Sequence, residues 1–189
     1  MSRSWVFPFA ITLVAGLGLI VVIDYLALWS PSPVSASSEP AARARPAHAA
    51  PDLVGVTPDG QSGGEVLSRK HAALCMFVSS RSVADQRMLD DVQSAVDRRG
   101  RPHDLDIVAI DAGQDPTERT IGLWHDQGYR MPLVLGPRDD PTANARSFGI
   151  EHFPAAVWLS SEGEVVSVTE LYGRTSRAAL MERLETFLP

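Results

Sequence analysis

The side chains whose types and spacing most clearly suggest a functional site lie in the stretch F-V-S-S-R-S-V-A-D at residues 77–85. Ser82 and Asp85 are three positions apart where a helical pattern begins. A serine at a helix N-cap and an acid at N3 satisfy unpaired N–H groups of the first turn, an interaction worth about 1 kcal/mol. The pattern therefore predicts that Ser82 caps a helix.

A second interpretation of the same stretch is a polar binding site. Such a site combines the cap with the basic side chain before it and with a later segment that carries a histidine and a proline. Its candidate residues are Arg81, Ser82, Asp85, His152, Phe153 and Pro154. The two interpretations are compatible, and neither assigns a catalytic residue.

Cys75 is the only cysteine of the chain, so no intramolecular disulfide can form. One interpretation is a reactive thiol, or a copper ligand together with Met76. However, Cys75 lies within the apolar run 72–78, and unpaired cysteines are among the most buried residue types. Neighbours in a strand point to opposite faces, so the two sulfur atoms do not readily share a metal. The sequence favours a buried, structural thiol.

Other site classes find little support in the sequence. The histidines after the linker lack metal-ligand spacing, and we predict neither a metal site nor a cofactor: His71, His103, His125 and His152. The glycine-rich phosphate loop and the G-x-S-x-G motif are both missing from the sequence. The net charge is −6 and no basic patch stands out, which argues against a nucleic-acid partner.

Strands and helices are expected to alternate along the chain. The predicted strands are residues 72–78, 105–110, 132–135, 155–159 and 164–169, preceded by a short hairpin around Pro58-Asp59-Gly60. The predicted helices are residues 83–98, 115–127 with Asp115 as N-cap, 141–148, and one beginning at Thr175. This order predicts an α/β fold with a mainly parallel central sheet, helices on both faces and an antiparallel final hairpin.

The N-terminus predicts a membrane anchor. Residues 5–23 carry no charge, and residues 25–29 are apolar again. A helix of that length extends about 30 Å, the thickness of one hydrocarbon core. Arg3 precedes the span and no basic residue follows it before Arg43, which favours a cytoplasmic N-terminus.

A cleaved signal peptide is the alternative, with residues 34–36, Val-Ser-Ala, as the cleavage site. Either interpretation exports the folded domain. The predicted organisation is a cytoplasmic N-terminus, an anchor, a linker rich in Pro, Ala and Ser, and one folded domain: residues 1–4, 5–29, 30–50 and 51–189. The expected location is a bacterial inner membrane, with a single span and a periplasmic C-terminal domain.

From about residue 51 onward, the chain resembles the membrane-tethered thioredoxin-like family of the TlpA/ResA type. The resemblance rests on the order and spacing of several short segments: A-P-D-L at 50–53, L-C-M-F-V-S-S at 74–80, S-F-G-I at 147–150, F-P-A-A-V-W-L at 153–159 and S-E-G-E-V at 161–165. It implies a thioredoxin-like fold. It also implies that Pro154 follows a cis peptide bond and faces the position of the family's C-x-x-C motif.

The chain departs from the family at its redox motif, because Ser82 and Asp85 stand where two cysteines are expected. Disulfide exchange needs an attacking thiolate and a resolving thiol, and neither residue supplies one. The leading hypothesis is therefore a redox-inactive, tethered domain that binds protein partners as an accessory subunit of a membrane or periplasmic complex. The alternatives are an oxidoreductase or maturation factor that uses Cys75 or a partner's thiols, and a copper-handling protein.

Overall fold

The computed structural model describes residues 48–68, 70–113, 116–171 and 173–189. The predicted anchor at residues 5–29 and most of the linker lie outside these ranges. Within the described ranges, no helix combines the length and the apolar character needed to span a bilayer.

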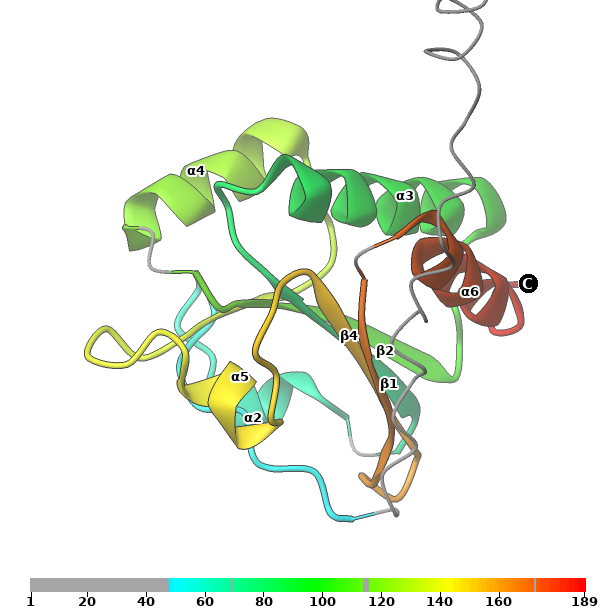
Figure 1. The fold of residues 1–189 in the computed structure, drawn as a ribbon, viewed down its shortest axis with the longest axis horizontal. Coiled ribbons are helices and arrows are strands. Elements are labelled where there is room, and N and C mark those ends of the chain that lie inside the picture. The colour runs from blue at the N-terminus through cyan, green and yellow to red at the C-terminus, as the bar shows by residue number, and fades with distance from the viewer. Residues whose placement is uncertain (1–47, 69, 114–115, 172) are drawn as a thin grey trace, which may run out of the picture. The chain divides into compact units, whose positions relative to one another are not determined.

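One five-stranded sheet organises the described part of the chain (Figure 1). Its strands are β1 (Ala72–Val78), β2 (Leu105–Asp111), β3 (Leu133–Leu135), β4 (Ala155–Leu159) and β5 (Val165–Glu170). Their order across the sheet is β3-β2-β1-β4-β5. The first three strands are parallel, β4 runs antiparallel to β1, and β5 runs antiparallel to β4. The unbroken apolar run of β1 agrees with its central place, because helices cover both of its faces.

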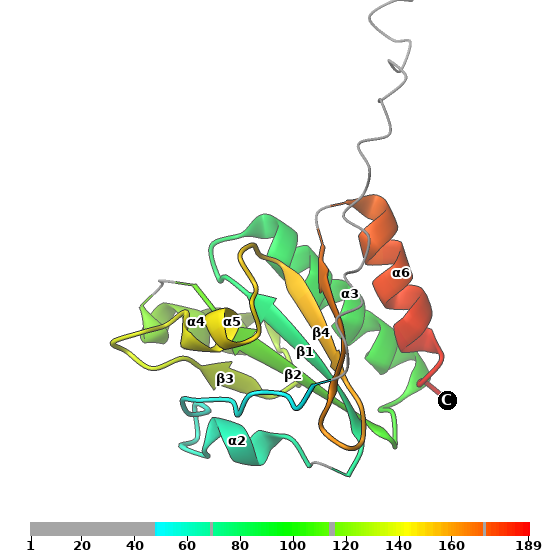
Figure 2. The same ribbon diagram turned by 60° about the horizontal axis from the view of Figure 1, so that its bottom comes forward.

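Helices cover the two faces of the sheet unequally (Figures 1 and 2). On one face lie α3 (Val83–Arg99), α4 (Thr117–Gln127) and α6 (Arg174–Glu185); on the other lie the short α2 (Gly63–Val66) and α5 (Ala143–Ser147). Each face has its own hydrophobic core cluster, and alternate residues of β1 contribute to one or the other. Two cores on opposite faces of one sheet confirm the predicted layering.

Most predicted elements are confirmed to within a residue or two. The third predicted helix is shorter, since α5 covers residues 143–147 only. At the second helix, Pro116 occupies the N-cap that the sequence assigned to Asp115, which lies outside the described residues. The last helix begins at Arg174, one residue before Thr175.

The predicted hairpin before β1 is present only as a tight turn that one antiparallel bridge, between Val56 and Ser62, closes. The expected turn exists, with Thr57 N–H donating to the Gln61 carbonyl at 2.9 Å, but only single bridges flank it. The backbone of Val56 also pairs with the far edge of the sheet, at Leu135, through hydrogen bonds of 3.1 and 2.8 Å. Gly55 allows this approach, since a Cβ there would lie 1.9 Å from the Leu135 carbonyl oxygen.

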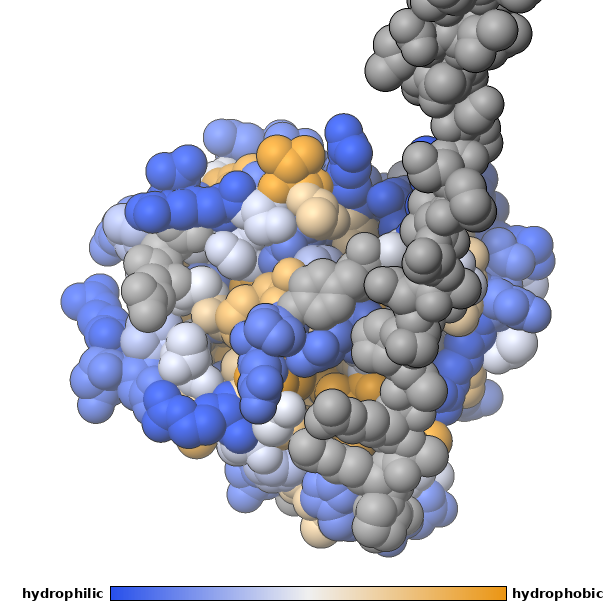
Figure 3. Space-filling view, in the orientation of Figure 1, coloured by the Kyte–Doolittle hydropathy of each residue, from blue (hydrophilic) through white to orange (hydrophobic). Residues whose placement is uncertain are grey.

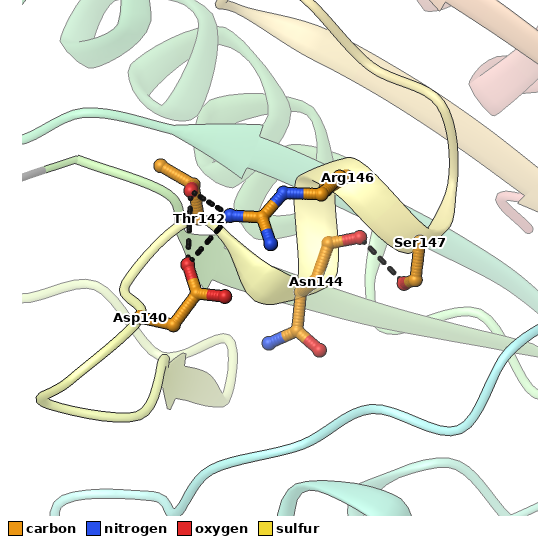
Figure 4. A network of polar contacts seen from close by, with 5 residues as sticks. All are labelled: Asp140, Thr142, Asn144, Arg146 and Ser147. Atoms are coloured by element: carbon orange, nitrogen blue, oxygen red, sulfur yellow. Dashed lines mark hydrogen bonds and ion pairs between the residues drawn. The ribbon is translucent and has the colours of Figure 1, made fainter.

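Figure 4 shows a network of polar contacts around α5, and one of its residues, Asn144, also holds the N-terminal segment in place. Arg146 binds Asp140 at 2.9 Å, which ties the loop before α5 to the helix. The fully buried amide of Asn144 accepts from Val54 N–H at 2.9 Å and donates to the Val54 carbonyl at 2.8 Å. One side chain therefore satisfies both backbone groups of a residue ninety positions away.

Candidate functional site

Ser82 caps α3 as the sequence predicts. Its backbone is extended (φ −87°, ψ 119°), and its hydroxyl oxygen accepts the Asp85 N–H at 3.2 Å. The Ser82 carbonyl then accepts the N–H of Gln86 at 3.0 Å, which starts the helical hydrogen-bond ladder. The loop that leaves β1 is thus closed directly onto the helix N-terminus.

The Asp85 carboxyl turns inward instead of returning to the cap residue. Ser82 N–H is already donated to the Ser79 carbonyl at 3.1 Å, so a reciprocal capping box is not available. Asp85 Oδ2 accepts the Ser79 N–H at 2.6 Å, while Oδ1 has no partner within the described part of the chain. The side chain is fully buried. Burial raises the pKa of Asp85 above its ordinary value, and hydrogen bonds with Ser82 and Ser79 only partly oppose the rise.

Pro154 lies beside this cap. The Phe153–Pro154 peptide bond is cis, as expected from the resemblance. In the antiparallel register of β1 and β4, Phe77 faces Ala155, so the next residues outward, Val78 and Pro154, are neighbours where the capping loop begins. Pro154 is buried and its carbonyl accepts the Leu171 N–H at 2.8 Å.

The residue before the proline, Phe153, presents a peptide edge, by which we mean its backbone N–H and C=O groups. The Phe153 ring is half-buried against the core, but its backbone N–H and C=O have no hydrogen-bond partner among the described residues. His152 and Arg81 are both exposed, on the loops before Pro154 and before Ser82 respectively. The structure therefore brings Ser82, Asp85, Phe153 and Pro154 to one edge of the sheet, with the two basic side chains on the flanking loops.

This architecture is found in solved structures of other proteins. The thioredoxin domain of a thiol-disulfide oxidoreductase from Bacteroides vulgatus superposes with a TM-score of 0.55 at 18% identity, over 72% of this chain and 96% of that one. A thiol:disulfide interchange protein from Bacteroides sp. superposes with a TM-score of 0.55 at 18% identity, over 75% of this chain and 91% of that one. A secreted disulfide oxidoreductase from Mycobacterium tuberculosis superposes with a TM-score of 0.53 at 14% identity, over 71% of this chain and 96% of that one.

The fold is thioredoxin-like. No family model and no curated protein matches the sequence. At these identities the likeness concerns the fold, so the chemistry must be derived from the residues of this chain.

The thioredoxin-like fold buries the one thiol of the chain away from the candidate site. Cys75 is fully buried and belongs to the core on the face of α2 and α5, whereas Ser82 and Asp85 lie on α3 at the opposite face. Burial, followed by the charge of Asp106, raises the pKa of Cys75 to about 12. At neutral pH the sulfur is a protonated thiol, which is neither a nucleophile nor a metal ligand. The structural interpretation of Cys75 holds.

A buried polar layer beneath the cap was not found from the sequence. Thr120 on α4 donates to Asp111 Oδ2 at 3.0 Å and lies 3.3 Å from the Ser80 hydroxyl, and all three residues are buried. The Gly113 N–H donates to the second carboxylate oxygen of Asp111 at 3.1 Å. The available signal was a carboxylate that ends an apolar strand, a position at the ligand-binding edge of an α/β sheet.

A pocket of about 380 Å³ opens at the same edge, beyond Asp111. It lies between the start of α4 and the loop that follows β3, with Glu118 and Arg138 among its lining residues. Within the described residues, no three His, Cys, Asp or Glu side chains gather as a metal site. The edge is therefore polar and hollowed, and its described residues include no thiol.

Proposed function

We propose that this chain is a thioredoxin-like domain that binds proteins and does not exchange thiols. It would act as an accessory subunit of a membrane or periplasmic complex, tethered by residues 5–29 to the periplasmic face of a bacterial inner membrane. One observation carries the proposal: a closed helix cap, made by Ser82 and Asp85, stands in place of a dithiol beside the peptide edge of Phe153, with which no described residue pairs.

The cap argues against reaction at this position. The Ser82 hydroxyl accepts a backbone hydrogen bond, and the Asp85 carboxyl is buried and bonded to the Ser79 N–H. A serine hydroxyl and a carboxylate cannot form or resolve a mixed disulfide. The Ser82 oxygen caps α3, and the Asp85 carboxyl ties the first turn of this helix to the Ser79 N–H.

The adjacent edge supports binding. An extended segment of a partner can pair its backbone with N–H and C=O groups such as those of Phe153, just before β4, and side-chain pockets then supply specificity. Beside the cap, Val83 is 61% exposed at the first position of α3. Figure 3 shows hydrophobic side chains at the surface at the top of the view, where α3 and α4 lie in Figure 1. Apolar surface beside an unpaired backbone edge suits an extended peptide.

The tether is proposed from the sequence. The uncharged run at residues 5–23 and the charge distribution around it favour a single span with an inward N-terminus. The linker at residues 30–50 would give the folded domain reach from the bilayer.

A second candidate function is a thiol-disulfide oxidoreductase or maturation factor that acts through a partner's thiols. The solved structures of similar fold favour it, because the three described above are named as oxidoreductases or as an interchange protein. Within this chain, such chemistry has only the buried Cys75 to use.

Turnover distinguishes the two functions. The full-length chain in lipid nanodiscs is assayed for dithiothreitol-driven insulin reduction, together with Cys75→Ser. We expect no rate above buffer for either protein. A rate in the wild type that Cys75→Ser abolishes would establish the oxidoreductase and overturn the proposal.

Site-specific photocrosslinking tests the binding edge in native membranes. Benzoylphenylalanine replaces Val83 beside the cap or, as the matched control, Val166, which is 43% exposed on β5. We expect a discrete protein adduct from position 83 only, weakened by Arg81→Glu or His152→Ala. Equal adducts from both positions, or adducts that neither variant alters, would show that this edge is not the interface.

A further inference from the structure

A second pocket lies far from the cap, on the α3 and α4 face of the sheet. We name it the α3–β2 pocket; its volume is about 350 Å³, and its lining comes from the second half of α3, the first half of β2 and the segment before β3. Val96 is among the lining residues, and along α3 it lies about 20 Å from Ser82 at 1.5 Å per residue. This pocket is therefore separate from the candidate site.

The floor of the pocket is apolar. Val92, Leu105 and Met131 are 0%, 3% and 7% exposed, while Val96 and Ile107 are only partly covered. A partly exposed isoleucine on β2 is unusual, because this strand lies inside the sheet. The Ile107 side chain remains partly exposed because α4 ends at Gln127 and α3 alone lies beside the first half of β2.

The walls of the pocket are held by specific contacts. Gly128 adopts the left-handed conformation (φ 67°, ψ 30°) that turns the chain out of α4. The indole N–H of Trp124 donates to the Met131 carbonyl at 3.0 Å, and the Tyr129 hydroxyl donates to Asp90 at 2.7 Å. These bonds fasten the segment before β3 to both helices, so the pocket is preformed.

The rim of the pocket is positively charged. Asp97 is neutralised by Arg130 at 3.0 Å and also accepts from Gln93 at 2.8 Å. Arg101 lines the same rim and makes no hydrogen bond or ion pair with any described residue. Two guanidinium groups and one carboxylate give the rim a charge of +1, in a chain of net charge −6.

We propose that the α3–β2 pocket binds a small amphipathic anion, with an apolar body on the floor and a carboxylate at Arg101. The volume is at the lower end of the range for small-molecule sites, and an apolar lining with few convergent polar groups is their usual composition. A guanidinium that has no partner among the described residues, at the mouth of an apolar pocket, complements a carboxylate head group. This inference is independent of the function proposed for the site at Ser82, Asp85, Phe153 and Pro154.

The test uses the five methionines as reporters. The full-length chain is labelled with ¹³C-methyl methionine in nanodiscs and titrated with octanoate and with its neutral isostere octanamide. We expect a saturable shift of the Met131 signal with a millimolar dissociation constant for octanoate, weaker binding of octanamide, and little change at the core residues Met76 and Met88. The absence of a saturable Met131 shift, or equal affinity for both compounds, would overturn the proposal.

Variants place the binding in the pocket. Arg101→Glu should weaken octanoate about fivefold, the size expected for reversal of an exposed charge. Arg119→Glu, on the exposed surface of α4, makes the same change of charge outside the pocket and should leave the affinity unchanged. Val96→Phe should fill the floor and remove saturation, with the Met88 signal reporting that α3 is intact. If Arg101→Glu and Arg119→Glu act alike, or if Val96→Phe binds normally, the ligand is not in this pocket.

Discussion

Restoring two cysteines at the cap tests whether Ser82 and Asp85 occupy the dithiol positions of a thioredoxin-like fold. In the double variant Ser82→Cys/Asp85→Cys, the thiols stand at the N-cap and N3 of α3. Helix residues three apart have Cβ atoms about 5–6 Å from each other, close enough for a disulfide after small adjustments. We expect an intramolecular disulfide to form in a glutathione buffer.

The energetic effect follows from the contacts that change. Loss of the Ser82 cap costs about 1 kcal/mol. Removal of Asp85 eliminates a buried oxygen without a partner but leaves the Ser79 N–H without its acceptor; each effect is about 1–3 kcal/mol, with opposite signs. A disulfide that closes so short a loop adds about 2 kcal/mol in the chain-entropy account. The oxidised variant should thus be about 2 kcal/mol more stable than its reduced form.

Thiol counting and urea unfolding measure both parts of this prediction. After denaturation, the oxidised variant should show one thiol, that of Cys75, and the reduced variant should show all three. The single variant Ser82→Cys controls for the lost cap, and a gain of insulin reduction by the double variant would show that only the dithiol is missing. The reasoning is refuted if no intramolecular disulfide forms, because residues 82 and 85 would then not stand in dithiol geometry.

The other predictions concern Asp85 and Gly55. Burial raises the folded-state pKa of Asp85, so the stability that its neutral carboxyl contributes is complete below about pH 4 and is lost as the pH rises through the folded-state pKa. In urea titrations, Asp85→Asn should therefore gain free energy of unfolding relative to wild type as the pH rises, and a difference that does not change with pH would contradict this. Gly55→Ala should cost about 2–4 kcal/mol through backbone strain and loss of the pairing with Leu135. The control Gly60→Ala also has a positive φ but meets no atom within 4 Å, and it should cost about 1 kcal/mol; equal costs would refute the role assigned to the close approach.

The local sequence pattern was sufficient to predict those features of the fold that depend on residues close together in the chain. The apolar run of β1 predicted a buried central strand, because only a strand covered on both faces lacks polar alternation. Ser82 predicted the start of α3, since an N-cap depends on atoms within one turn. The alternation of strands and helices likewise predicted the layers of the α/β fold.

Tertiary structure decided what depends on residues distant in the chain. The sequence predicted a hairpin at residues 57–61, and the structure retains its turn and one bridge. The sequence did not predict that Val56 also pairs with Leu135, because only long-range packing makes that edge available. The sequence predicted Asp85 as a residue of the helix cap. Its complete burial, and the buried polar layer of Ser80, Asp111 and Thr120, could not be predicted because they arise where three elements of the fold meet.

The motif at residues 77–85 illustrates both what the sequence determines and what the tertiary structure determines. The sequence alone determined that the chain cannot carry a dithiol, because it has a single cysteine. Only the fold decided that Cys75 is sealed in the core, with its pKa raised to about 12, and that the cap lies beside the cis-proline. The physical reason is that residue types are local properties, whereas burial and proximity are set by the packing of the whole sheet.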